Sequence, residues 1–200
     1  MELNSILRQA PYFTKQNLAL ALDKKGDNLD YWIKKLIKDE ALISLKKGFY
    51  ISSYYLDLVS QEPKKKEDYF EYLANMLRFP SYVSLEYVLS NCGFLPETVF
   101  AITSVTLKST RVYESKVGTF SYRHIKNSLF SNYGHKIASP AKALFDLLYL
   151  KNSAYIKNEN RMNWDALSLE DKTEFVNLVK TSNSGKMQKI VIFLKRKGIL

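Results

Sequence analysis

Residues 28–38, NLDYWIKKLIK, decide how the N-terminal part of this chain folds. From residue 29 the apolar side chains recur at i, i+3, i+4, i+7 and i+8, which is typical of a helix that buries one face. Asn28 can cap the first turn of this helix. The opposite face carries four residues at the same helical spacing: Tyr31, Lys34, Lys35 and Lys38. The stretch therefore predicts an amphipathic helix with three cations on its exposed side.

The segments on either side of this helix predict a small domain. Residues 3–10 have helical spacing that stops at Pro11, and Thr14 can cap a second helix that ends before a turn containing Gly26. Residues 41–45 and 49–52 read as two strands joined by a basic turn, Lys46-Lys47-Gly48. The order helix, helix, turn, helix, hairpin is that of a winged helix-turn-helix. We expect this domain over residues 1–60.

The residue types on the predicted third helix and hairpin suit DNA. Lysine ammonium groups neutralise phosphates, and tyrosine or asparagine side chains hydrogen-bond to phosphates or base edges. The expected contact residues are Asn28, Tyr31, Lys34, Lys35, Lys38, Lys46 and Lys47. Two other interpretations remain open: the lysine stripe can be only the solvated side of a helix, or the domain can dock a protein partner.

Composition excludes several classes of protein. Thirty Lys and Arg against twenty Asp and Glu in 200 residues give a formal net charge of +10, which favours polyanionic partners. Cys92 is the single cysteine and there are two histidines, so we expect no internal disulfide, no metal site and no cofactor. Neither a membrane span nor an export signal is evident, which predicts a cytoplasmic protein without membrane contact.

The rest of the chain predicts a mixed domain after a linker. Residues 61–68 form a polar, charged run that contains a proline, and we place the linker there. In residues 69–200 we expect a helix over 69–77, three strands between 98 and 123, and helices that begin near Ser84, Ser139, Ser168 and Gly185. The predicted fold class is α+β, an N-terminal winged helix-turn-helix followed by a mixed α/β domain.

Two segments carry a family resemblance: residues 77–89, LRFPSYVSLEYVL, and residues 137–149, IASPAKALFDLLY. They resemble the AbiEi-type antitoxins, which are transcriptional regulators of abortive-infection, or type IV toxin-antitoxin, systems. The resemblance covers roughly residues 10–150. It implies a winged helix that binds inverted repeats in the protein's own promoter and represses it. It also implies an α/β antitoxin domain that counteracts a nucleotidyltransferase toxin, and it places Lys34, Lys35 and Lys38 on the DNA side.

Two further features have structural and functional interpretations. Lys142 and Asp146, at i and i+4 after a Ser139-Pro140 helix start, are expected to form a surface pair that serves as scaffold. Residues 180–200 hold six Lys and Arg and no acid, so this end predicts either a second DNA-contacting patch or a solvated helix. The residues of that candidate patch are Lys186, Lys189, Lys195, Arg196 and Lys197.

A nuclease is the competing enzyme class. Metal-dependent nucleases place an acid and an acid-x-Lys triplet on neighbouring strands, where they hold a divalent ion and orient water. Glu97, Glu114 and Lys116 imitate this spacing. Because no second acid supports the cluster, we expect a non-enzymatic protein with no catalytic residues. Its expected partners are double-stranded DNA and a cognate toxin, with a homodimer on the DNA.

Overall fold

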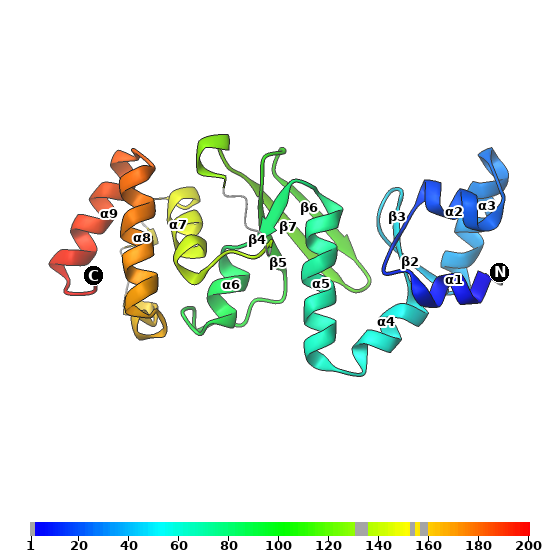
Figure 1. The fold of residues 1–200 in the computed structure, drawn as a ribbon, viewed down its shortest axis with the longest axis horizontal. Helices are drawn as coiled ribbons and strands as arrows, with labels where there is room; N and C mark the ends of the chain where they lie inside the picture. The colour runs from blue at the N-terminus through cyan, green and yellow to red at the C-terminus, as the bar shows by residue number, and fades with distance from the viewer. Residues whose placement is uncertain (1–2, 131–135, 153–154, 157–159) are drawn as a thin grey trace. The chain divides into compact units, whose positions relative to one another are not determined.

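In the computed structural model, residues 3–130, 136–152, 155–156 and 160–200 are described. Figure 1 shows the helices and strands of these residues. Their contacts divide the chain into two units. The first comprises Met1–Leu77 and Tyr113–Thr119, and the second comprises Arg78–Val112 and Phe120–Leu200. Helices and strands occur in both, so the fold is mixed α+β, as the sequence predicts.

The first unit combines helices with a small antiparallel sheet. Its elements are α1 (Leu3–Gln9), β1 (Phe13–Thr14), α2 (Lys15–Leu22), α3 (Gly26–Lys38), β2 (Leu42–Lys46), β3 (Phe49–Ser52), α4 (Ser53–Ser60) and α5 (Pro63–Leu77). The strands lie in the order β1-β3-β2, with Phe13 opposite Tyr50 and Ile43 opposite Ile51. The predicted helices before residue 40 and the predicted hairpin are confirmed, whereas β1 and α4 were not expected.

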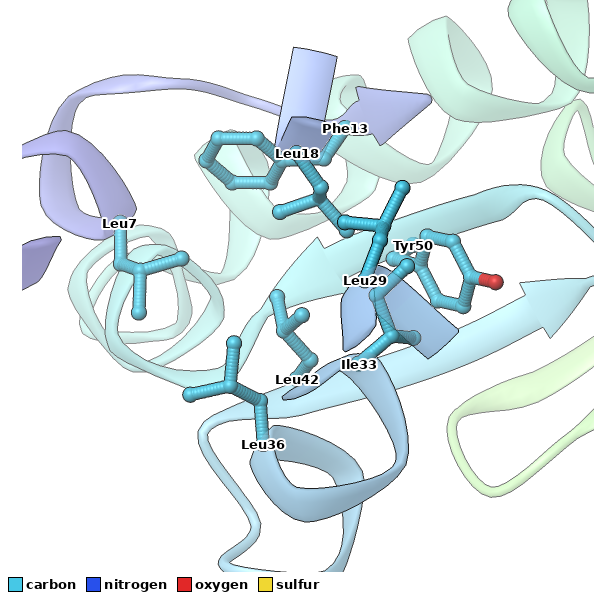
Figure 2. Packing of buried hydrophobic residues seen from close by; sticks show 8 residues of the cluster. All are labelled: Leu7, Phe13, Leu18, Leu29, Ile33, Leu36, Leu42 and Tyr50. Carbon is cyan, nitrogen blue, oxygen red and sulfur yellow. The ribbon is translucent and has the colours of Figure 1, made fainter. Parts of the chain in front are cut away.

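A compact apolar core holds α3 against the rest of this unit. Leu29, Ile33 and Leu36, at i, i+4 and i+7, supply the buried face of α3. Figure 2 shows them together with residues from α1, β1, α2, β2 and β3. Those residues are Leu7, Phe13, Leu18, Leu42 and Tyr50. Because this face of α3 is buried, the orientation of the opposite face is fixed as well.

Residues 61–68, the expected linker, are mostly helical. Helix α5 begins at Pro63, where the missing N–H of proline costs no helical hydrogen bond. Lys64 lies 3.2 Å from Glu67 and 3.0 Å from Asp68, and such i, i+3 and i, i+4 pairs support a helix. Residues 63–68 of the charge run therefore form the beginning of α5, and the first unit continues to Leu77.

The second unit contains a four-stranded mixed sheet together with helices. Its elements are β4 (Ser81–Val83), α6 (Glu86–Asn91), β5 (Ile102–Thr106), β6 (Arg111–Ser115), β7 (Gly118–His124), the 3-10 turns η1 (Asn127–Leu129) and η3 (Trp164–Ala166), α7 (Pro140–Leu150), α8 (Leu169–Thr181) and α9 (Gly185–Arg196). The strand order is β4-β5-β7-β6, antiparallel between β4 and β5 and parallel between β5 and β7. Residues Tyr113–Ser115 of β6 and Gly118–Thr119 of β7 are grouped with the first unit.

The predicted helix starts in this unit are largely confirmed. Ser139 caps α7 with Pro140 in its first turn, and Ser168 forms a capping box with Asp171 at the start of α8. Ser84 does not cap α6, which begins at Glu86 after Leu85. In the part of the chain that is described, no helix has the length and apolar character needed to cross a bilayer.

Candidate functional site

Helix α3 begins earlier than the sequence predicts. Its first residue is Gly26, and the N–H of Leu29 already donates to the carbonyl of Lys25 at 3.3 Å. Asn28 is therefore an exposed residue of the first turn and not the cap. Asp27 also lies in this turn, where a carboxylate interacts favourably with the helix dipole.

The exposed side of α3 carries the four residues expected there. Tyr31 is 62% exposed, and Lys34, Lys35 and Lys38 are all exposed. The Lys35 ammonium lies 4.9 Å from the centre of the Trp32 ring. None of the three lysines pairs with a described carboxylate. The surface formed by Tyr31, Lys34, Lys35 and Lys38 is called the α3 cationic face below.

An acid in the middle of α3 is neutralised from another helix. Asp30 forms an ion pair with Lys15, the first residue of α2, at 2.5 Å. Thr14 fixes that end of α2: its hydroxyl accepts from the N–H of Asn17 at 3.2 Å, and the Asn17 side chain accepts from the N–H of Thr14 at 3.0 Å. The positive charge of the α3 cationic face is thus not offset by Asp30.

The two hairpin lysines have different environments. Lys46 is half-buried in a bulged part of β2, and its ammonium donates to the Leu77 carbonyl and lies 5.8 Å from the centre of the Phe49 ring. The Lys46 ammonium is thus held by the protein itself, and its contact with DNA stays a prediction. Lys47 is exposed at the turn. Lys47 is thus the exposed lysine of the basic turn.

The candidate second patch on α9 also loses one member. Lys186 is half-buried, and its ammonium donates to the carbonyls of Tyr149, at 2.8 Å, and Lys151. Burial lowers the pKa of Lys186. The remaining residues of the predicted patch are exposed: Lys189, Lys195, Arg196 and Lys197. The structure thus keeps a smaller basic surface at the end of α9.

Lys142 and Asp146 are not a surface pair, because their side chains are 1% and 0% exposed. They form a buried ion pair on α7, and the Lys142 ammonium also donates to the Tyr82 hydroxyl at 2.8 Å. Asp146 accepts from the hydroxyls of Tyr82, at 2.9 Å, and Ser84, at 2.8 Å. Burial lowers the pKa of Lys142 and raises that of Asp146, while the attraction between the two charges opposes both shifts.

This buried tetrad joins the two segments that carry the family resemblance. Tyr82 and Ser84 come from β4 and the residue after it, whereas Lys142 and Asp146 come from α7. Sequence reasoning missed the junction, although Tyr82 and Ser84 at i and i+2 share one face of a strand. Each of the four side chains is hydrogen-bonded and buried, so the tetrad is closed to solvent in this structure.

The nuclease-like residues belong to two different units, and two of them have ion-pair partners. Glu97 is paired with Arg161 at 2.8 Å and belongs to the second unit, whereas Glu114 and Lys116 belong to the first. Lys116 lies 3.8 Å from Glu40. Among the described residues, no group of three or more His, Cys, Asp or Glu side chains could hold a metal ion.

The remaining reactive side chain, Cys92, is not activated. It is half-buried, and its thiol donates to the Leu89 carbonyl at 3.3 Å. Burial raises the pKa of the Cys92 thiol, which lowers the thiolate fraction at neutral pH. His124 ends β7 with an exposed side chain, and His135 lies outside the described residues.

Comparison with known proteins gives no identification. No model of a known protein family matches the chain, and no curated protein matches it significantly. The charges, burial and contacts of its own side chains therefore carry the functional inference.

Proposed function

We propose that the chain is a DNA-binding transcriptional autorepressor whose N-terminal unit is a winged helix-turn-helix. The element order α1-β1-α2-α3-β2-β3 and the strand order β1-β3-β2 support this proposal. In that fold a helix-turn-helix presents its second helix to the major groove, and a hairpin flanks it as the wing. Helix α3 would be the recognition helix, and β2 and β3 would form the wing.

The observation that carries the proposal is the set of cations on the α3 cationic face that have no carboxylate partner among the described residues. Lys34, Lys35 and Lys38 are exposed on a helix whose opposite side is fixed in the core. A lysine that neutralises a DNA phosphate releases a condensed counterion, and this release drives binding. Lys47 on the hairpin and the net charge of +10 favour the same polyanion.

The finer part of the proposal follows the family resemblance. The DNA would be inverted repeats in the protein's own promoter, bound by two copies related by a two-fold axis. The α/β part would act as the antitoxin against a nucleotidyltransferase toxin of a type IV system. The buried tetrad supports a scaffold role for the two resemblance segments. No reaction and no cofactor are assigned, and the cytoplasm is the proposed location.

The test is retardation of the chain's own upstream promoter fragment against an unrelated fragment of equal length. The assay is run across a salt series without added metal. We expect the promoter to be preferred by about a thousandfold, with affinity that falls steeply as salt rises. Equal weak binding to both fragments, or no binding, would contradict the repressor function.

A second candidate function, docking of a protein partner, is favoured by apolar exposure on the same unit. Leu20 on α2 is 84% exposed, and Tyr31 on α3 is also exposed. Large exposed side chains of this kind are used in protein recognition. This function predicts a stoichiometric complex with the partner that is insensitive to salt, and no retardation of DNA.

A further inference from the structure

A polar pocket lies in the second unit, and its lining includes none of the residues proposed to contact DNA. Its volume is about 230 Å³, and its walls come from the start of α6, the C-terminal half of α7, the end of β7 and the loop before β6. Two leucines of α7 line it together with Leu85, Glu86, Thr110, Arg123, His124 and Lys151. Arginine, histidine and lysine, three residue types that bind anions, therefore line the same small pocket.

The charges in this pocket leave a cation without a counterion. Glu86 is the acid of the lining, and its carboxylate is held by Lys151 at 2.9 Å. The Arg123 side chain is exposed and makes no ion pair or hydrogen bond with another described residue. The Arg123 guanidinium is thus available to bind an anion, whereas the charges of Glu86 and Lys151 neutralise each other.

Arg123 lies near the carboxyl end of β7, next to the parallel strand β5. Strands β5 and β7 run parallel, and Thr106 and His124 pair at their carboxyl ends. Ligands of parallel sheets bind beyond this end of the strands. The loop that follows β5 is held there too, because the N–H of His124 donates to the Thr110 hydroxyl at 3.1 Å.

The opposite wall of the pocket has a strained backbone. Leu85 has φ 65° and ψ −139°, a region that residues with a side chain rarely adopt. The residue before it is held firmly, since the Ser84 N–H donates to the Thr103 carbonyl at 3.0 Å and its hydroxyl donates to Asp146. Strain of this kind persists where the surroundings over-determine it, and it gathers at ligand sites.

We propose that this pocket binds the phosphate group of a small phosphomonoester through Arg123. The planar guanidinium donates two parallel N–H bonds that match a phosphate, and charge-assisted bonds of this kind are strong. Pockets for drug-sized ligands usually span about 300–1,000 Å³, so a smaller pocket suits the phosphate group, with the rest of the molecule outside. Ser84, the residue before Leu85, is itself part of the buried tetrad.

The test is a titration of the ¹⁵N-labelled full chain, followed by amide chemical shifts, at constant ionic strength. The probes are inorganic phosphate and a nucleoside 5′-monophosphate. Both should shift the amides of Thr110, Arg123 and His124 saturably. Arg123→Ala should lower the affinity for both probes by about tenfold or more. Arg123→Lys, which keeps the charge, should lower it less.

The matched control is Arg111→Ala, which removes an exposed arginine of β6 that does not line the pocket. It should leave both affinities unchanged. Three results would overturn the proposal: no saturable shifts at these amides, shifts that persist in Arg123→Ala at the wild-type affinity, or a response only to a phosphodiester dinucleotide. An unchanged amide spectrum outside the pocket shows that the Arg123 variants are folded.

Discussion

Lys142 and Asp146 are two opposite charges placed inside α7, where residues 141–148 are all buried. A buried ion pair contributes little net stability compared with an apolar pair of similar volume. Removing only one of its two charges, however, leaves the other charge buried and unpaired, which is strongly destabilising. We therefore predict that Lys142→Met lowers the free energy of unfolding by about 3–5 kcal/mol. Urea denaturation measures this loss.

The matched control for that variant is the double substitution Lys142→Met with Asp146→Leu. It removes both charges and should cost clearly less than the single change. A single variant that loses less than about 1 kcal/mol, the usual value of a surface pair, would contradict the burial of Asp146.

For single residues, the sequence predicts which side chains pair better than it predicts whether they are buried. The i, i+4 spacing predicts that Lys142 and Asp146 pair, and they do. Their burial depends on Tyr82 and Ser84, which are about sixty residues away in the chain. Lys46 is predicted to contact DNA from its place in the basic turn, whereas in the structure its ammonium donates to a carbonyl of α5.

Among the elements, α2 depends on its capping box. Thr14→Ala removes the hydroxyl that accepts from the N–H of Asn17, so we predict a loss of about 1 kcal/mol in the free energy of unfolding. Thermal or urea unfolding measures it. Thr14→Ser keeps the hydroxyl and should stay close to wild type, and an equal loss in both variants would argue against the cap.

In the hairpin, we predict that Lys47 affects the salt dependence of DNA binding and that Lys46 affects the stability of the fold. Lys47→Ala should lower the salt dependence of DNA binding by about one counterion and leave stability unchanged, because its side chain is exposed. Lys46→Ala should lower stability and leave the salt dependence unchanged, because its ammonium is held by the Leu77 carbonyl. Unfolding curves and retardation across salt measure the two effects; the reversed pattern would refute this assignment.

The helices that sequence reasoning found are those with a clear period or cap. Thr14, Ser139 and Ser168 each mark a helix start that the structure confirms. The strands β1 and β4 were missed because they have two and three residues and depend on a partner strand. Phe13 pairs with Tyr50, a contact that no local pattern specifies.

At the scale of the whole molecule, the charged residues 61–68 predict a domain boundary, whereas the contacts continue the first unit to Leu77. The run of residues 61–68 resembles a linker in composition, but ion pairs within it and Pro63 at its helix start make it part of α5. The net charge of +10, by contrast, is a property of composition and needs no fold. It favours a polyanionic partner, and we propose the α3 cationic face as the site for that partner.

The most direct test of the central claim is the salt dependence of promoter binding by the triple variant Lys34→Ala, Lys35→Ala, Lys38→Ala. Its control is Lys64→Ala, Lys65→Ala, Lys66→Ala, which removes the same charge from the start of α5. If α3 contacts the phosphates, the first variant loses about three counterions from the slope of log affinity against log salt, and the control keeps the wild-type slope. A wild-type slope and affinity in the first variant would contradict DNA binding through α3.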